Sequence, residues 1–367
     1  MDRDEIIKKL RELRGGDLLY EDGRILSSVS TKPPGISVEA FEIFSDTNAL
    51  DTHVFKGVKR MEDEVIQWFG SVLHNPGVAG YITTGGTEAN IMALYVAREM
   101  NPEKREIIVP ESAHYSIERA ASLMDLRVSW VPLDEDFRAD LSAVEARINR
   151  DTLAVIATAG TSALGVIDPI KEMSELCGDV FFHVDAAFGG FVIPFLDRPH
   201  EFDFRLSGVD SITIDPHKMG MAPIPAGSIF FRDMSYLEAL KIKPTYLPFS
   251  TYTLSGSRSG GSIAAVWAVI NYLGIEGYRR IIRECMRNTE ILCGELKKIS
   301  EVRILVEPEI NFVAITVEDV ERVWDTLRGR GWDILLDERS GSMRIVVMPH
   351  VTEDSIKDFV RDLREIV

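Results

Sequence analysis

Five short apolar runs, separated by helix-length segments, dominate the middle of the chain. They lie at residues 107–109, 128–132, 153–157, 180–184 and 212–214. Continuous Val, Ile, Leu and Phe runs of this length are typical of parallel strands that are buried on both faces, and the segments between them have room for covering helices. The pattern predicts an α/β fold built on a mostly parallel, doubly wound sheet.

The rest of the chain suggests two flanking parts. Residues 1–55 are polar and irregular after a first helix, with a turn at Pro33-Pro34-Gly35. A long helical stretch at about 262–300 precedes two more apolar runs, 312–317 and 343–347, each followed by an amphipathic helix. We therefore expect an N-terminal segment (1–55), a large domain (56–270) and a small C-terminal α+β domain with its linking helix (271–367).

Composition excludes several classes of function. The chain has 41 Lys and Arg against 58 Asp and Glu, a net charge of -17, which is unsuited to nucleic acid. Its longest apolar run, 263–270, is far shorter than a membrane span requires. The first 16 residues, MDRDEIIKKLRELRGG, predict an amphipathic surface helix and no signal peptide, so we expect a cytoplasmic protein. Its three cysteines show no metal-binding spacing, and we expect no metal.

A glycine turn opens one of the expected helices. In GYITTGGTEANIMALYVARE, a short strand-like piece is followed by Gly85, Gly86 and Thr87 and then by a helix from Glu88. Glycines allow a ligand to approach the backbone closely, and the first amides of a helix favour an anion. The segment is a candidate phosphate site; a plain tight turn is an equal alternative, because the spacing matches no established nucleotide-binding motif.

Two further strand ends carry charged side chains. Asp185 ends the apolar run in FFHVDAAFGG. Parallel sheets bind ligands at the carboxyl ends of their strands, so its carboxylate is a candidate ligand contact. An aspartate at this position also suits a helix N-cap. Lys218 follows the run at 212–214, and such a lysine is usually solvated. Its neighbours Met219, Met221 and Ala222 are apolar, and desolvation favours the neutral, nucleophilic form of an amine.

A phosphate site, a carboxylate and a lysine at the strand ends of one sheet meet the needs of pyridoxal 5'-phosphate (PLP). Its aldehyde needs an amine, its pyridine nitrogen needs a carboxylate, and its phosphate needs an anion site. The sequence therefore predicts PLP as the cofactor.

The motifs also resemble those of a known family, the group II PLP-dependent amino-acid decarboxylases. The segments that carry the resemblance are TTGGTEANIMAL, SAHYS, TAGTSALGVIDPI, HVDAAFGG, DPHKMGMAPIPAG and SGSRSG, in the family's order over roughly residues 45–350. The chain is most similar to the short archaeal L-tyrosine/L-aspartate decarboxylases. The resemblance implies the fold-type-I PLP-dependent transferase fold, which is the aspartate aminotransferase-like fold.

The resemblance also implies roles for single residues. Lys218 would bind the cofactor covalently, with His217 at its phosphate. Asp185 would pair with the pyridine nitrogen. The other expected cofactor contacts are Gly85, Gly86 and Thr87 at the phosphate, Ala187 and His114 on the two faces of the ring, and Ser162 near its edge. From the sequence alone, His114 could equally be an ordinary polar residue that caps a helix.

Further implied residues concern the partner subunit and the substrate. Ser257 of SGSRSG would reach the phosphate of the neighbouring subunit, which implies an obligate homodimer with a shared active site, and His53 would join that shared site. Arg344 would lie near the substrate carboxylate, or else form a structural ion pair. The longer relatives carry their proton-donating tyrosine on a long loop; here the loop is short, and Tyr246 and Tyr252 are both candidates.

The reaction that we expect is decarboxylation of an L-amino acid, with tyrosine or aspartate favoured by the resemblance. The products, tyramine and β-alanine, would serve methanofuran or coenzyme A biosynthesis. Two alternatives remain: a PLP-dependent carbon-carbon lyase related to sphingosine-phosphate lyase, and a catalytically silent protein that retains the fold. The first would release an aldehyde in place of CO2, and the second would purify without cofactor.

Overall fold

The computed structural model describes residues 1–367 and contains two compact units. The larger unit comprises Pro33–Arg283, and the smaller combines Met1–Lys32 with Glu284–Val367. The division into 1–55, 56–270 and 271–367 remains a prediction about domains.

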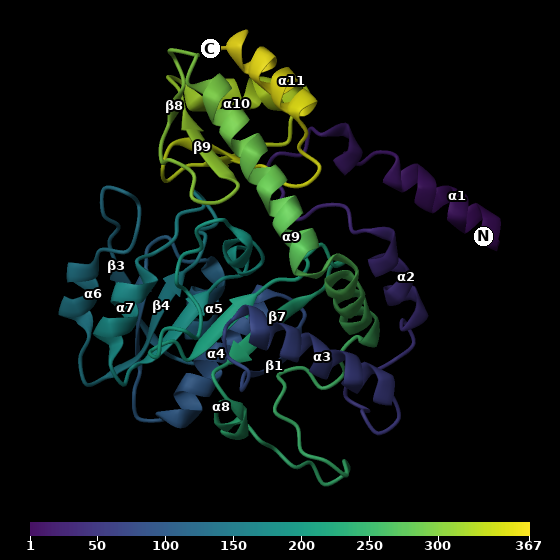
Figure 1. Ribbon diagram of the computed structural model, residues 1–367, viewed down its shortest axis with the longest axis vertical. Coiled ribbons are helices and arrows are strands. Elements are labelled where there is room, and N and C mark those ends of the chain that lie inside the picture. Colours follow the sequence, from purple (N-terminus) through teal and green to yellow (C-terminus); the bar gives the residue numbers. More distant parts are fainter. The chain divides into compact units, whose positions relative to one another are not determined.

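A seven-stranded sheet forms the centre of the larger unit (Figure 1). Its order is β1-β7-β6-β5-β4-β2-β3, and only β7 runs antiparallel to its neighbours. The strands are β1 (Ala79–Thr83), β2 (Glu106–Pro110), β3 (Arg127–Val131), β4 (Thr152–Thr158), β5 (Phe181–Asp185), β6 (Ser211–Ile214) and β7 (Gly227–Phe231). The mostly parallel α/β sheet predicted from the apolar runs is confirmed.

Burial explains why these runs lack the alternation of a half-exposed strand. Every residue of β1, β4, β5, β6 and β7 is buried, whereas the edge strand β3 is partly exposed. The helices of this unit are α2 (Gly35–Ile43), α3 (Lys56–Val72), α4 (Gly86–Met100), α5 (Tyr115–Leu123), α6 (Leu141–Arg147), α7 (Ile170–Cys177), α8 (Met234–Glu238), the short 3-10 turns η2 (Gly189–Phe191) and η3 (Ile193–Phe195), and the first part of α9 (Gly260–Leu296).

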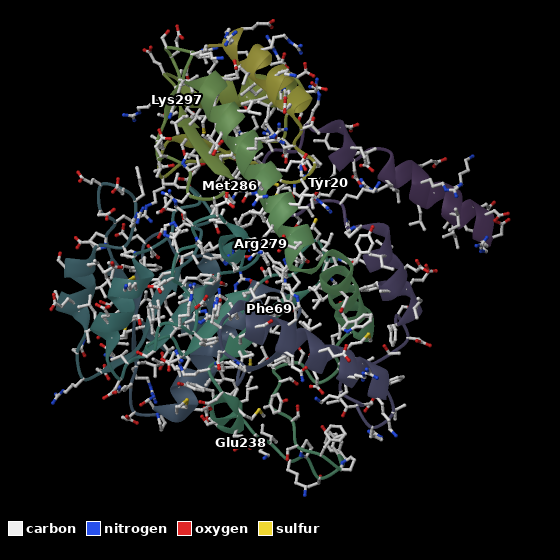
Figure 2. The ribbon with its side chains drawn as sticks, viewed as in Figure 1. Tyr20, Phe69, Glu238, Arg279, Met286 and Lys297 are labelled. Atoms are coloured by element: carbon white, nitrogen blue, oxygen red, sulfur yellow. The ribbon has the colours of Figure 1, made fainter.

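Neighbouring residues of β7 show that helices cover both faces of the sheet. The ring of Phe230 lies 4.5 Å from the ring of Phe69 on α3, which is labelled in Figure 2. Phe231 instead belongs to the apolar cluster that includes α4 and α5. Successive side chains of a strand point to opposite faces, so α3 and α4 lie on opposite sides of the sheet. Helices α6 and α7 pack on β3 and β4 (Figure 1).

Two local expectations need correction. The chain between the first helix and residue 55 is not irregular throughout, and Pro33-Pro34-Gly35 is not a turn, because helix α2 starts at Gly35 with Pro34 as its N-cap. Prolines suit a helix start, where no intrahelical amide bond is lost. The long helical stretch is also interrupted: Gly274 has a φ of 57°, so α9 consists of two helices that meet at this residue.

The smaller unit is the expected α+β structure. Its antiparallel sheet has the order β10-β11-β9-β8. The elements are α1 (Arg3–Arg14), η1 (Tyr20–Asp22), β8 (Arg303–Ile304), β9 (Phe312–Thr316), α10 (Val320–Gly329), β10 (Leu335–Asp337), β11 (Ser342–Val346) and α11 (Glu353–Arg364), with the end of α9. Helix α1 has no buried residue, as expected for a surface helix.

Candidate active site

Most of the candidate residues follow the carboxyl ends of the parallel strands. The glycine turn follows β1, His114 follows β2, Ser162 follows β4, Asp185 ends β5, and Lys218 follows β6. Strand β7 runs in the opposite direction, so its first residues lie at the same edge of the sheet. The carboxyl edge of an open α/β sheet is where such folds bind ligands.

The glycine turn is closely packed against the segment after β6. A Cβ atom on Gly86 would lie 2.9 Å from Asp215 Oδ2 and 3.4 Å from the Cβ of Ala187. A Cβ atom on Gly85 would lie 3.4 Å from the His217 ring. Thr87 lies in the first turn of α4, whose leading amides face no intrahelical acceptor. The turn thus offers backbone amides and a hydroxyl where a larger residue would not fit.

Lys218 has a charged partner that sequence reasoning missed. Its Nζ lies 3.1 Å from Asp215 Oδ2, and His217 Nε2 lies 3.6 Å from the same oxygen. Asp215 is buried, and its other oxygen, Oδ1, has no hydrogen-bond partner. The pKa of His217 is lowered by burial, against the opposing charge of Asp215. The expected apolar environment of Lys218 is present, because Met219, Met221 and Ala222 are buried.

Asp185 is held on both oxygens. Oδ1 accepts a hydrogen bond from the backbone N–H of Ala187 at 3.0 Å, and Oδ2 accepts one from Asn90 Nδ2 at 2.8 Å. The helix N-cap that the sequence offered as an alternative is not formed, because the next helical turn, η2, begins only at Gly189; the Ala187 bond closes a local turn. The Asn90 bond comes from α4 and leaves a buried carboxylate fixed at the strand end.

His114 is the N-cap of α5, so the helix-cap reading is correct for its local structure. Its Nδ1 lies 3.3 Å from the backbone nitrogen of Ser116, which donates to it, and 2.8 Å from Ser116 Oγ. Burial lowers the pKa of His114, and the nearby Asp185 opposes this shift. The cap and a role at the site are compatible, since capping uses only one ring nitrogen.

Ser162 is exposed in the turn that follows β4. Asp168 fixes this turn from within: it accepts backbone hydrogen bonds from Thr158 at 2.7 Å and Ala139 at 2.9 Å. Burial raises the pKa of Asp168 to about 6. The structure therefore places Ser162 on a braced loop at the correct edge of the sheet.

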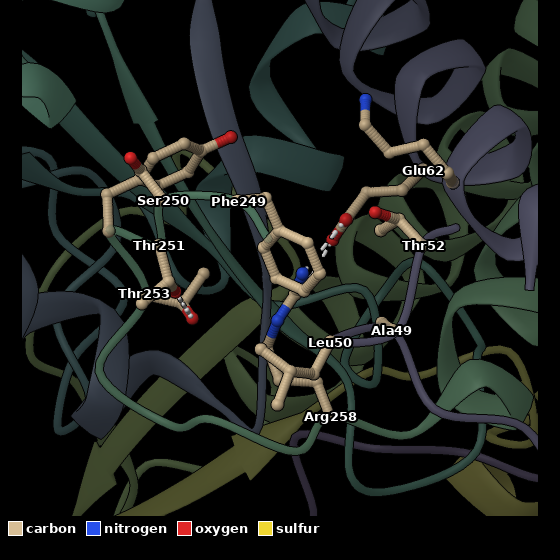
Figure 3. Close-up of a pocket in the computed structure, with 11 residues that line it drawn as sticks. Ala49, Leu50, Thr52, Glu62, Phe249, Ser250, Thr251, Thr253 and Arg258 are labelled. Atoms are coloured by element: carbon tan, nitrogen blue, oxygen red, sulfur yellow. Dashed lines mark hydrogen bonds and ion pairs between the residues drawn. The ribbon is translucent and has the colours of Figure 1, made fainter. Parts of the chain in front are cut away.

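A second group of candidates lies around a pocket shown in Figure 3. Tyr252 lines it, together with Phe249, Arg258 and Glu62. His53 is exposed, with its ring 5.9 Å from that of Phe249. Tyr252 is half-buried, and this burial raises its pKa. Tyr246, a few residues earlier in the chain, is 83% exposed.

The SGSRSG loop borders this pocket and is anchored by a buried ion pair. Arg258 makes a two-point contact with Glu62, and one of its two bonds is 3.0 Å long. Ser257 Oγ accepts a hydrogen bond from Asn48 Nδ2 at 3.2 Å. Ser255 Oγ lies 3.3 Å from Glu88 Oε1 on α4, so the loop also contacts its own chain near the glycine turn.

Arg344 belongs to the smaller unit, on the central strand β11. It is buried and donates from Nη2 to the carbonyl oxygen of Ser27. Burial lowers its pKa to about 10, and Asp333 and Asp337 oppose this shift. The contact with Ser27 therefore supports a structural role for Arg344 within the smaller unit.

The fold and this arrangement of lysine and carboxylates define a class: the fold-type-I PLP-dependent enzymes. The structure resembles the sphingosine-1-phosphate lyase of Burkholderia pseudomallei with a TM-score of 0.93 and 29% identity, over 100% of this chain and 90% of that one. Residues 46–318 match the family described as the pyridoxal-dependent decarboxylase conserved domain, and the chain belongs to this family.

Two relatives extend over almost the whole chain. The sequence is 44% identical to the probable L-tyrosine/L-aspartate decarboxylase of Methanocella arvoryzae, over 99% of this chain and 98% of that protein. It is 42% identical to the probable L-aspartate decarboxylase of Archaeoglobus fulgidus, over 99% of both chains. The expected decarboxylase family and its cofactor, PLP, are thus confirmed. None of the helices combines the length and the apolar character that a membrane span requires.

The residues at the sheet edge fit PLP on structural grounds. A Cβ on Gly86 would press against Asp215, so glycine lets the backbone amides of the turn lie close to the segment after β6, and helix α4 begins there. The amine of Lys218 and the carboxylate of Asp185 come from neighbouring strands, which pair through Asp185 and Thr213. Their chemistry matches the anion site, the amine and the carboxylate that the cofactor requires.

Proposed function

We propose that this protein decarboxylates L-aspartate, L-tyrosine or both, using PLP bound through Lys218. The observation that carries the proposal is the meeting of Lys218, Asp185 and the Gly85-Gly86 turn at one edge of the sheet. The names of the two relatives above support the choice of substrates. The products would enter methanofuran or coenzyme A biosynthesis.

Each residue at the sheet edge then has a definite task. Gly86, Thr87 and His217 would bind the phosphate, Ala187 and His114 would contact the ring, and Ser162 would lie near its edge. When bound, PLP supplies the electron sink that makes loss of CO2 possible. Asp185 would hold the proton of the pyridine nitrogen through its negative charge, and two hydrogen bonds keep its carboxylate in place.

Asp215 acts on Lys218 and His217 in this proposal. Its carboxylate lies within 3.1 Å of Lys218 Nζ and holds the amine at the glycine turn. It also faces His217 Nε2, while His217 Nδ1 accepts the backbone N–H of Ala226 at 3.2 Å. The three side chains therefore form one charged group beside the phosphate site.

The proton that returns to the substrate carbon has two candidate sources. Tyr252 lies half-buried in the pocket of Figure 3, and Tyr246 extends into solvent on the same loop. An antiparallel bridge between Ile242 and Thr251 closes the base of the loop that carries Tyr246, and Tyr252 follows directly after this bridge. We propose that one of these two hydroxyls serves as the donor. Tyr246→Phe and Tyr252→Phe, assayed separately, identify which one lowers kcat.

We also propose a homodimer in which Ser257 and His53 of one chain complete the site of the other. Exposed apolar side chains on α2 and nearby loops support a covered surface here: Ile36, Val38, Ile43, Val54 and Leu254. Arg344 would bind the substrate carboxylate through its planar guanidinium. Its contact with Ser27 supports the structural alternative equally.

The substrate panel is the decisive experiment. Purified protein with PLP is incubated with L-aspartate, L-tyrosine, L-glutamate and L-phenylalanine, and CO2 and amine are measured together. We expect equal amounts of CO2 and amine from aspartate or tyrosine, and none from the Lys218→Ala protein. An aldehyde fragment without CO2 would instead favour the carbon-carbon lyase, which the similarity to sphingosine-1-phosphate lyase keeps as the second candidate.

A further inference from the structure

Asn90 lies at the centre of a buried polar network that joins four elements. It is 1% exposed on α4. Its Nδ2 is 2.8 Å from Asp185 Oδ2 and 2.8 Å from Ser116 Oγ. Its Oδ1 is 2.7 Å from Thr213 Oγ1 and 3.0 Å from His183 Nε2. One amide thus contacts β5, β6 and α5 at once.

We propose that Asn90 is a positioning residue that fixes both the Asp185 carboxylate and the proton of the His114 ring. The proposal rests on the proposed function, in which these two side chains contact the cofactor. Asn90 itself touches no ligand in this account. It acts through the hydrogen bonds that it makes to Asp185 and, by way of Ser116, to His114.

The carboxylate determines which way the Asn90 amide faces. A carboxylate only accepts hydrogen bonds, so Nδ2 must point to Asp185 and Oδ1 must point away. Oδ1 then accepts the hydroxyl proton of Thr213 and the Nε2–H of His183. His183 Nδ1 in turn accepts from Ser211 Oγ at 2.8 Å. Complete burial keeps His183 neutral, with its pKa lowered to about 4.

The same amide also acts on the position of the proton on His114. The second hydrogen of Asn90 Nδ2 is donated to Ser116 Oγ, so the Ser116 hydroxyl directs its own hydrogen to His114 Nδ1. The backbone N–H of Ser116 donates to that nitrogen as well. His114 Nδ1 is therefore an acceptor, and the neutral ring carries its proton on Nε2. That N–H is the donor that His114 offers to a ligand.

Exchanging the positions of Oδ1 and Nδ2 of Asn90 would break the hydrogen bonds of this network. Asn90 Oδ1 would then face the Asp185 carboxylate, and Nδ2 would face the Nε2–H of His183. A buried network of this kind is favourable only when every member is satisfied. The alternative is that Asn90 only joins α4 to the sheet. The experiments below must distinguish this structural role from the positioning role.

The first test uses the cofactor-free protein labelled with ¹⁵N-histidine. The chain has seven histidines, and the His114→Gln and His183→Gln proteins assign the two relevant signals. We expect the wild-type ¹⁵N shifts to show a neutral ring protonated on Nε2 at both His114 and His183. In the Asn90→Asp protein the new carboxylate accepts the Ser116 hydroxyl, so that hydroxyl no longer opposes a proton on His114 Nδ1. The Nδ1-protonated fraction of His114 should therefore rise, although the long bond from the Ser116 backbone N–H still favours the Nε2 form. A wild-type His114 protonated on Nδ1, or an unchanged His114 in the Asn90→Asp protein, would overturn the proposal.

The second test measures the dissociation constant of PLP by titrating the cofactor-free protein. Asn90→Ala removes the bond to Asp185, and we expect the constant to rise about 10- to 100-fold, which corresponds to one hydrogen bond to a charged group. Thr213→Val is the matched control, because it removes a bond only on the Oδ1 side; we expect a change below about threefold. If both proteins lose thermal stability and bind PLP alike, Asn90 is structural and the proposal fails. Neither test measures turnover. If the protein did not decarboxylate amino acids, the ¹⁵N shifts and the PLP dissociation constants would still show whether Asn90 positions Asp185 and His114.

Discussion

At the scale of single residues, the two oxygens of Asp185 have different partners, and both matter. Asp185→Asn removes the charge and places an NH2 group against an existing donor, either Asn90 or the Ala187 amide. We expect kcat to fall about 100-fold or more, the scale of losing an electrostatic contact at an active site. Some PLP should still bind, with a dissociation constant raised at least as much as in the Asn90→Ala protein. Asp185→Glu should retain part of the activity. Asp233→Asn, at the N-cap of α8, is the control. Full activity in Asp185→Asn would reduce this residue to a turn cap.

Gly86 is a second residue with a defined prediction. A Cβ at this position would lie 2.9 Å from Asp215 Oδ2, so the turn proposed to bind the phosphate would have to move. We therefore expect Gly86→Ala to raise the PLP dissociation constant at least about tenfold. Gly294→Ala is matched to it, because this exposed helical glycine has nothing within 4 Å of its added Cβ. The control should bind PLP normally and gain about 0.5–1 kcal/mol of stability. Equal PLP affinity in both proteins would contradict the assignment of the phosphate site.

The sequence predicted these site residues because each stands in a local motif at a strand end. It did not predict Asn90 and Asp215, although both lie inside the segments TTGGTEANIMAL and DPHKMGMAPIPAG. Asn90 and Asp185 are 95 positions apart, and only the packing of α4 on β5 brings them into contact. No sequence pattern records such a contact. Asp215 would have been found by asking which carboxylate lies one helical turn before the lysine.

At the scale of elements, the Arg258–Glu62 pair joins the SGSRSG loop to α3. Both side chains are almost buried, and Glu62 also accepts the backbone N–H of Ile82 at 3.0 Å. Arg258→Ala leaves a buried carboxylate without its cation, which costs about 3–5 kcal/mol in comparable pairs. We expect the free energy of unfolding in urea to fall by that amount.

The neighbouring pair Arg60–Glu64 supplies the control for this element. This pair likewise joins an arginine to a glutamate of α3, and here the arginine belongs to α3 as well. The side chain of Arg60 is 82% exposed, unlike that of Arg258. Exposed pairs contribute little because water screens them. Arg60→Ala should leave the unfolding midpoint nearly unchanged. If the two arginine variants lost the same stability, burial of the Arg258 pair would not be what anchors the loop.

The elements themselves were predictable where apolar runs and connections were regular. The runs at 107–109, 128–132, 153–157, 180–184 and 212–214 became β2 to β6. Strand β7 was missed because it returns directly from β6, with no helix between them to mark a new unit. Strands β8 and β10 have two and three residues, too few for any periodicity to appear.

At the scale of the whole molecule, the proposed site shared between two subunits predicts recovery of activity on mixing two inactive proteins. One protein carries Lys218→Ala and the other carries Ser257→Tyr, which blocks the loop. After subunit exchange, a mixed dimer should contain one interface with an intact lysine and an intact loop, and activity should return. A mixture that exchanges subunits but stays inactive would mean that the loop serves its own chain, as the Ser255–Glu88 contact allows.

The central claim is that Lys218 carries the cofactor, and peptide mapping after borohydride reduction tests it most directly. Reduction fixes PLP irreversibly to the amine that holds it, and mass spectrometry then locates the label. We predict a single labelled peptide, containing Lys218, and no label in the Lys218→Ala protein. A label on any other lysine in the wild-type protein, or an unchanged label in the Lys218→Ala protein, would contradict the account.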